Sequence, residues 1–338
     1  MAQPLPELRA RGIVDLLDAT VRLYRRHFAT LLGVSAVLLL PFGLASTVGS
    51  YYLTLAFGPV LNYTASPVGF RPDTTQTAIG VIGLSLALLI TGVVGPLAQG
   101  ALAITISEQY LGRTITVGEA YRRARPYWAS LFIVSLVFGL IVSIGPLAGT
   151  LLGGLVGVPL GMLASPNTGL VIGLLVGGLG LLGGCVLAVV VVVWFFLYDT
   201  VMVVEGIRGM DSMQRARALV RGYFWHSLGA MFLAFLGTLL VAMIATGPAS
   251  VAATLLANWR QELFAPMQLA SQCTQQIVSI LIGPVTMITQ TLLYYDLRIK
   301  KEGFDLQQMA EVLRGGTGDR GGVGAQAAAE GVPFEGAG

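Results

Sequence analysis

The sequence repeats one unit three times, and each copy is a basic amphipathic stretch followed by two long apolar segments. The copies begin near Ile13, Thr116 and Asp211. Internal repetition constrains the architecture before any local structure is assigned, because each copy must build the same supersecondary unit. We therefore predict an all-α integral membrane protein with six transmembrane helices. They form three repeated hairpins, each preceded by a cytoplasmic interfacial amphipathic helix.

Six segments contain no Asp, Glu, Lys, Arg or His. Each is long enough to cross a hydrocarbon core of about 30 Å, which takes roughly 20 helical residues. Only 11% of the 338 residues are charged, against roughly 25% in soluble domains. Lipid offers the backbone no hydrogen-bond partner, so the segments must be helical. The predicted spans are Ala29–Val48, Ala78–Thr105, Ser130–Gly157, Gly169–Leu197, Ser227–Gly247 and Ile277–Tyr295.

Basic residues indicate how these spans are oriented. All of the twenty Lys and Arg except Arg71 and Arg260 fall on one side of the predicted spans. Loops rich in Lys and Arg are typically cytoplasmic. We therefore expect a multi-pass protein of the cell membrane with both termini in the cytoplasm. The first ten residues are polar and the first span is too long for a signal-peptide core, so we expect an uncleaved signal anchor.

The domain prediction follows the repeats. One membrane domain covers residues 10–314, with units of about 10–110, 111–206 and 207–303 and a closing helix at 305–314. A flexible N-terminus (1–9) precedes it. The Gly-rich tail 315–338 has no apolar periodicity, which predicts disorder.

Acidic residues recur where the apolar segments end. Asp199 and Asp296 each lie six residues before a Glu-Gly pair, at Glu205 and Glu302, and Glu108 occupies the matching place in the first unit. One interpretation is a ring at the cytoplasmic mouth that binds a cation or gates a pore. The other is that these acids anchor helix ends and pair with nearby Arg, as structural ion pairs commonly do.

Two glutamines, Gln99 and Gln290, are the main polar groups of the returning spans. They can line a polar path, or they can hydrogen-bond between helices, which is the commoner role of such side chains.

The basic stretches are candidates to hold lipid headgroups. In the first, Ile13, Leu17, Val21, Tyr24 and Phe28 share one face, which predicts a helix lying along the inner headgroups. Each Arg near an anionic surface contributes about 1 kcal/mol of attraction. The candidates are Arg22, Arg25, Arg26, Arg122, Arg123, Arg125, Arg215, Arg217 and Arg221.

Glycines recur every four residues in the third and fourth spans. Small residues at this spacing let helix backbones approach closely, which predicts a tight hairpin. The glycines are Gly145, Gly149, Gly153, Gly157, Gly161, Gly169, Gly173 and Gly177.

Motifs for chemistry are missing from the sequence. We find no P-loop, dinucleotide-binding glycine motif or nucleophile elbow. His27 and His226 have no acidic partner at catalytic spacing and belong to no metal-binding motif. We therefore expect no catalytic residue, metal, cofactor or nucleic-acid partner.

Three signatures resemble a known family. Ile13-Val14-Asp15-Leu16-Leu17-Asp18-Ala19, with Arg22 to Phe28 and Pro41, is the first. Glu205-Gly206 with Arg217 to Trp225 is the second, and Tyr295 to Leu306 is the third. Over about residues 10–313 the chain resembles the glycerophosphoryl diester phosphodiesterase membrane domain-like proteins of prokaryotes. The resemblance implies a six-span architecture only, because the chemistry of the phosphodiesterases belongs to a separate soluble barrel with no counterpart here.

The leading hypothesis is a non-enzymatic membrane module. It would bind or organise anionic phospholipid, or scaffold a partner membrane protein or a second copy of itself. The alternative is a transporter or channel for a lipid-like or small neutral solute. An enzyme acting on a lipid headgroup is the weakest of the three, because no cluster of acid, base and nucleophile is visible.

Overall fold

The computed structural model describes residues 12–61, 72–163, 166–259 and 264–303, and every regular element in these ranges is helical. The predicted closing helix, the N-terminus and the Gly-rich tail lie outside the described residues. In chain order the elements are α1 (Ile13–Arg26), α2 (Phe28–Leu61), α3 (Thr74–Leu89), η1 (Ile90–Val94), α4 (Gly95–Tyr110), α5 (Val117–Ala124), η2 (Arg125–Tyr127), α6 (Trp128–Leu152), η3 (Gly153–Gly157), α7 (Val158–Met162), α8 (Pro166–Phe195), α9 (Tyr198–Val204), α10 (Asp211–Val220), α11 (Phe224–Trp259) and α12 (Phe264–Glu302).

Six helical stretches are long and apolar enough to cross a membrane, as the sequence predicts. Several helices continue well past the predicted spans. Thus α2 runs on to Leu61, and α12 starts at Phe264 and ends at Glu302. A charge-free segment identifies only the part of a helix that can lie in lipid. The helix itself can extend further, because its backbone hydrogen bonds also form outside the lipid. The six stretches are Leu39–Phe57, Thr74–Tyr110, Val117–Gly157, Val171–Val204, Phe224–Ala252 and Pro266–Glu302.

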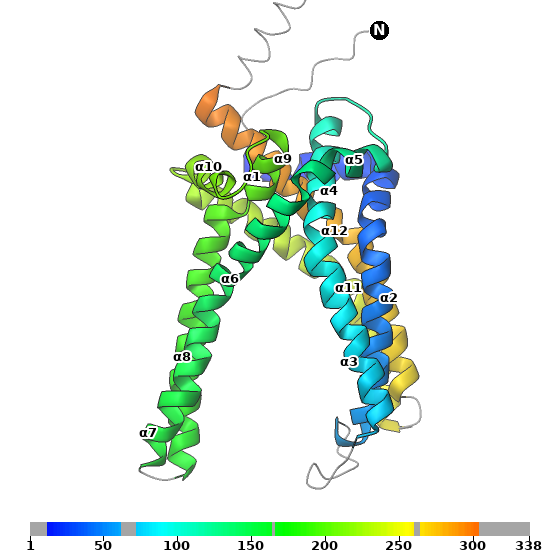
Figure 1. Cartoon of the computed structure of the whole chain (residues 1–338), viewed down its shortest axis with the longest axis vertical. Helices are drawn as coiled ribbons and strands as arrows, with labels where there is room; N and C mark the ends of the chain where they lie inside the picture. The colour runs from blue at the N-terminus through cyan, green and yellow to red at the C-terminus, as the bar shows by residue number, and fades with distance from the viewer. Residues whose placement is uncertain (1–11, 62–71, 164–165, 260–263, 304–338) are drawn as a thin grey trace, which may run out of the picture.

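The long helices form two legs that diverge from one end of the molecule (Figure 1). One leg contains α6, α7 and α8, and the other contains α2, α3, α11 and α12. Consecutive long helices pack along each other, α2 on α3, α6 on α8 and α11 on α12, and α12 also packs along α2. The short helices α1, α5, α9 and α10 gather where the legs meet. This end, formed by α1, α5, α9, α10 and the last turns of α12, is called the basic end below.

The largest cluster of buried apolar side chains lies at the basic end. It combines Leu16 of α1, Ile106 of α4, Met202 of α9, Leu219 of α10 and Leu293 of α12. These five side chains are all but inaccessible to solvent. The short helices are therefore parts of one packed core that joins the two legs.

Helix α1 packs on the protein through one strip of its surface and leaves part of its predicted apolar face exposed. Leu16, Ala19 and Thr20 are buried, while Val21 of the predicted apolar face is 53% exposed. The Thr20 hydroxyl lies 3.3 Å from the hydroxyl of Thr289 in α12. The strip of α1 that contains Leu16, Ala19 and Thr20 thus packs on the protein and contacts α12, whereas Val21 lies on a different, exposed strip.

The contact of α6 and η3 with α8 is made by glycine backbones. A methyl group on Gly149 would lie 2.1 Å from the carbonyl carbon of Gly180, and one on Gly153 would lie 2.3 Å from the Cα of Gly177. No side chain fits at such distances. Gly145 faces Gly184 and Gly157 faces Gly173 in the same way. The sequence pattern did not single out Gly180 and Gly184, while the surroundings of the predicted Gly161 and Gly169 are not described.

A π-helical turn, η1, interrupts the second long stretch just before Pro96. Proline has no N–H and cannot continue the regular helical ladder. A π-turn accommodates this break, and such turns often occur at functional sites. The Trp128 indole donates to the Val93 carbonyl oxygen at 2.8 Å and so satisfies an acceptor within the turn.

Candidate functional site

Four of the five predicted acidic positions are held in ion pairs. Glu108 lies 3.0 Å from Arg123 of α5 and 3.6 Å from Arg113. Asp296 in α12 is 2.6 Å from the Lys300 ammonium. These contacts match the anchoring interpretation of the acids.

Asp296 also has a partner that sequence reasoning missed. His226 at the start of α11 places its Nε2 3.0 Å from Asp296 Oδ2 and 3.1 Å from the Lys300 nitrogen. The histidine and the aspartate are seventy residues apart in the chain. No local spacing signal could have revealed this contact.

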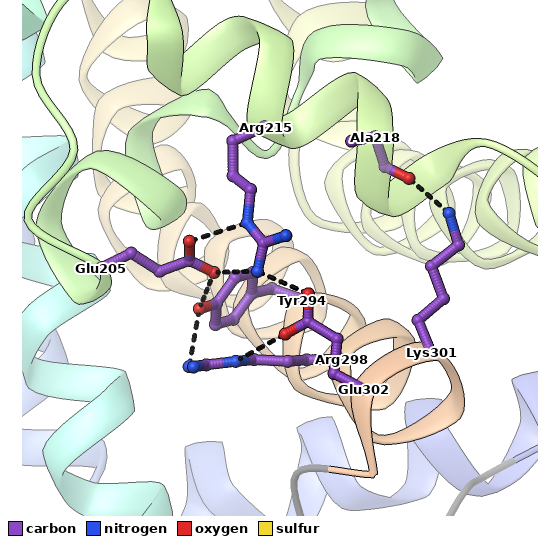
Figure 2. Close-up of polar contacts among 7 residues, drawn as sticks. All are labelled: Glu205, Arg215, Ala218, Tyr294, Arg298, Lys301 and Glu302. Atoms are coloured by element: carbon purple, nitrogen blue, oxygen red, sulfur yellow. Dashed lines mark hydrogen bonds and ion pairs between the residues drawn. The ribbon is translucent and has the colours of Figure 1, made fainter.

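Glu205 and Glu302 belong to a closed cycle of five side chains that joins α9, α10 and α12 (Figure 2). Arg215 of α10 places Nε 2.8 Å from Glu205 and Nη2 2.6 Å from Glu302. Tyr294 donates its hydroxyl hydrogen to Glu205 at 2.8 Å. Arg298 closes the cycle, with 3.1 Å to the Tyr294 oxygen and 3.3 Å to Glu302. Hydrogen bonding to Glu205 raises the pKa of Arg215 further above its usual value, so its charge is permanent.

The two Glu-Gly pairs also end their helices in the same way. Gly206 and Gly303 have φ angles of 73° and 59°. This left-handed conformation terminates helices and strains residues with a side chain. The glycines therefore end α9 and α12 just after the two glutamates of the cycle.

Asp199 differs from the other four acids. Its residue is only 4% exposed, and no Lys or Arg pairs with it in the part of the chain that the structure describes. The carboxylate accepts hydrogen bonds from the Thr200 backbone N–H at 2.7 Å and from the Gln290 amide. The sequence repeat makes Asp199 and Asp296 equivalent, yet the fold pairs one with cations and the other with an amide.

A cavity of about 560 Å³ adjoins Asp199 where the legs meet. Both predicted glutamines, Gln99 and Gln290, line it together with Asp199. Most of the remaining wall is apolar, with Phe138 and Met287 among its residues. The structure thus brings together three polar residues that lie far apart in the sequence.

The predicted headgroup arginines divide into two groups. Arg22 pairs with Asp18, Arg123 with Glu108 and Glu119, and Arg215 with Glu205 and Glu302. The other six are exposed and have no ion pair within the described ranges. They are Arg25, Arg26, Arg122, Arg125, Arg217 and Arg221.

Two of these six arginines line a second hollow, of about 750 Å³, beside α10. Arg217 and Arg221 share it with Gln214, Ala218 and Trp194. The Arg217 guanidinium lies 4.5 Å above the Trp194 ring, which is a cation–π contact.

Lys301 adds a cation next to this hollow. Its ammonium donates to the backbone carbonyl of Ala218, which is itself a wall residue (Figure 2). We call this hollow, lined by Trp194, Gln214, Arg217, Ala218 and Arg221, the basic hollow. Among the described residues, no three or more His, Cys, Asp or Glu side chains are grouped so that they could hold a metal ion.

Six long apolar helices, an all-helical fold over the described ranges and a basic end define a multi-pass membrane protein. The chain matches a family described as a domain of unknown function (DUF7847) over residues 29–297, and it therefore belongs to that family. No curated protein and no solved structure is significantly similar to it. None of these comparisons links the chain to the glycerophosphoryl diester phosphodiesterase membrane domain, and that resemblance stays a prediction.

Proposed function

We propose that this protein is a non-enzymatic membrane module that binds anionic phospholipid at the basic hollow. The observation that carries the proposal is the pair Arg217 and Arg221, whose guanidinium groups face one hollow without an acidic partner among the described residues. A guanidinium presents a planar fork of donors that matches phosphate oxygens. An anion in the hollow would supply the missing negative charge.

The neighbouring aromatic residue fits a site at the edge of a membrane. Trp194 lies in the last turn of α8, and indole rings prefer the headgroup zone of a bilayer. Its ring holds the Arg217 guanidinium at 4.5 Å, which fixes the direction of that side chain. A lipid headgroup could therefore meet the arginines while its chains remain in the hydrocarbon.

The proposal includes the repeat arrangement of the six spans and their orientation in the membrane. The six spans would be three repeated hairpins, each preceded by an amphipathic helix, namely α1, α5 or α10. The basic end would face the cytoplasm, with both termini there, because segments rich in Lys and Arg are retained on that side. Anionic lipids of the inner leaflet would then lie next to the basic hollow.

Removing both charges from the basic hollow tests the proposal. In Arg217→Gln/Arg221→Gln we expect retention of phosphatidylglycerol to fall about 10- to 30-fold, since each cation contributes roughly 1 kcal/mol. Native mass spectrometry of protein released from vesicles of phosphatidylglycerol and phosphatidylcholine measures the retained lipid.

The matched control removes two unpaired arginines elsewhere, in Arg25→Gln/Arg26→Gln of α1. Retention close to wild type in this control, with loss in the first variant, supports a defined site. An equal loss in both would show that the attraction is diffuse and that the basic hollow is not the site.

A second candidate function, movement of a lipid-like or small neutral solute, is favoured by the cavity at Asp199. Because Glu108 and Asp296 are ion-paired, Asp199 is the acid to change. In Asp199→Asn we expect the transbilayer flux of fluorescent phospholipid in proteoliposomes to fall to the level of empty liposomes. Unchanged flux, or wild-type flux that never exceeds that of empty liposomes, would remove this candidate.

A further inference from the structure

The Asp199 carboxylate lines the cavity between the legs, and its neighbouring donors bond to only one of its two oxygens. The hydrogen bonds from Thr200 and Gln290 to Asp199 all end on Oδ1. Neither residue reaches Oδ2. Asp199 is a wall residue of the cavity and is otherwise buried, so a ligand that contacts Oδ2 would have to come from inside that cavity.

Two amide groups add further acceptors. The Gln290 nitrogen donates to Asp199 Oδ1 and also to the Phe196 carbonyl oxygen at 2.5 Å. Because both neighbours are acceptors, the orientation of the amide is fixed, and its carbonyl oxygen remains for the cavity. Gln99 is exposed on the same cavity and has no hydrogen-bond partner within the described ranges.

The walls of the cavity provide no positive charge to pair with Asp199. No Lys, Arg or His lines the cavity. When Asp199 is ionised, burial of its charge is costly, and a cation bound beside it offsets that cost. The best-matched ligand group is therefore positive and rich in N–H donors.

The rest of the wall suits a hydrocarbon chain. Leu102, Phe138, Val192, Met231 and Met287 line the cavity, and its volume is in the range of ligand sites. It receives wall residues from both legs, from α11 and α12 of one leg and from α6 and α8 of the other. All of these wall residues belong to the six stretches that are long and apolar enough to cross a membrane, so an amphiphile of the bilayer can reach the cavity.

We propose that this cavity binds the primary ammonium group of a membrane amphiphile, with an ethanolamine phospholipid as the commonest source. A primary ammonium has three donors. The three acceptors that the cavity offers are Asp199 Oδ2 and the carbonyl oxygens of Gln99 and Gln290. This site is separate from the basic hollow, and it specifies the ligand for the second candidate function.

Lipid competition with an isosteric variant tests the charge requirement. We expect wild-type protein to retain phosphatidylethanolamine in preference to phosphatidylcholine with the same chains, and Asp199→Asn to lose about tenfold or more of that preference, since a hydrogen bond to a charged group is among the stronger kind. Native mass spectrometry counts the retained lipids. A single-chain primary alkylamine in a second arm shows whether the ammonium alone competes or whether the phosphate is needed.

A steric variant tests the location. A Cβ at Gly92 meets nothing within 4 Å, and Gly92 lines the cavity, so Gly92→Leu has room at its Cβ and adds a side chain at the cavity wall. Gly237→Leu is the control, because Gly237 is equally open but lies outside the cavity. We expect only Gly92→Leu to lower the retention of phosphatidylethanolamine.

Three results would overturn the proposal. They are no preference in the wild-type protein, an undiminished preference in Asp199→Asn, and an equal loss in the two glycine variants. The proposal for the basic hollow is tested separately, by phosphatidylglycerol retention in the Arg217 and Arg221 variant. Either proposal can therefore be contradicted without affecting the other.

Discussion

Gly149→Ala is expected to destabilise the protein, although alanine normally stabilises a helix relative to glycine by about 1 kcal/mol. The added methyl group would lie 2.1 Å from the Gly180 carbonyl carbon and 2.2 Å from its oxygen. Backbone atoms cannot rotate away as a side chain can, so α6 and α8 must separate. Overpacking costs about 1–3 kcal/mol and sometimes more, and we expect a loss at the upper end of that range.

The matched control for this prediction is Gly178→Ala, which lies in the partner helix α8. A Cβ at Gly178 meets nothing within 4 Å, so here we expect the ordinary gain of up to about 1 kcal/mol. Unfolding of both variants in the same detergent micelles gives the two free energies. The opposite signs are the test, and a gain at Gly149 equal to that at Gly178 would contradict the close contact of α6 with α8.

Arg215→Ala is expected to destabilise the basic end by about 2–4 kcal/mol, slightly below the roughly 3–5 kcal/mol found when a fully buried ion pair loses one partner. Arg215 bridges Glu205 and Glu302, and the Glu205 side chain is only 10% exposed. Without the guanidinium, Glu205 keeps only the Tyr294 hydroxyl from the cycle. The free energy of unfolding in micelles measures the loss.

Arg22→Ala is the control for Arg215→Ala. Arg22 lies 3.8 Å from Asp18, and both side chains are more than 70% exposed. Exposed pairs contribute about 0–1 kcal/mol, so we expect little change. Similar losses in the two variants would mean that the cycle adds nothing beyond an ordinary surface pair.

The number and approximate place of the spanning helices could be predicted from sequence, because the absence of charge over about 20 residues is a requirement of lipid itself. Helix ends were less predictable. Lys300 and Lys301 lie within α12, where Lys300 is held by Asp296 one turn earlier. A charge that is paired along its own helix does not end that helix.

The candidate sites were predictable only as residue types. The repeat made Asp199 and Asp296 look alike, and nothing local distinguished them. Their difference comes from what other segments bring. His226 and Lys300 reach Asp296, whereas Gln290 reaches Asp199.

The basic hollow could not have been found from a stripe of arginines. It is defined in part by Trp194 of α8, which α9 separates from α10 along the chain. It is also defined by the arginines that have no acidic partner, and the sequence does not show which these are. The sequence shows which residues are charged, but not which of them form ion pairs.

The two diverging legs have a mechanical consequence. Within the described ranges, α6 and α8 pack outside their own leg against α4, η1, η2, α10 and α11, while the rest of their leg diverges from the other leg (Figure 1). The leg of α6, η3 and α8 therefore projects as a long arm from a short region of contact, which would serve as its pivot. A small rotation at the pivot becomes a large displacement at the distal tips, so lateral pressure on the tips would be transmitted to the walls around Asp199.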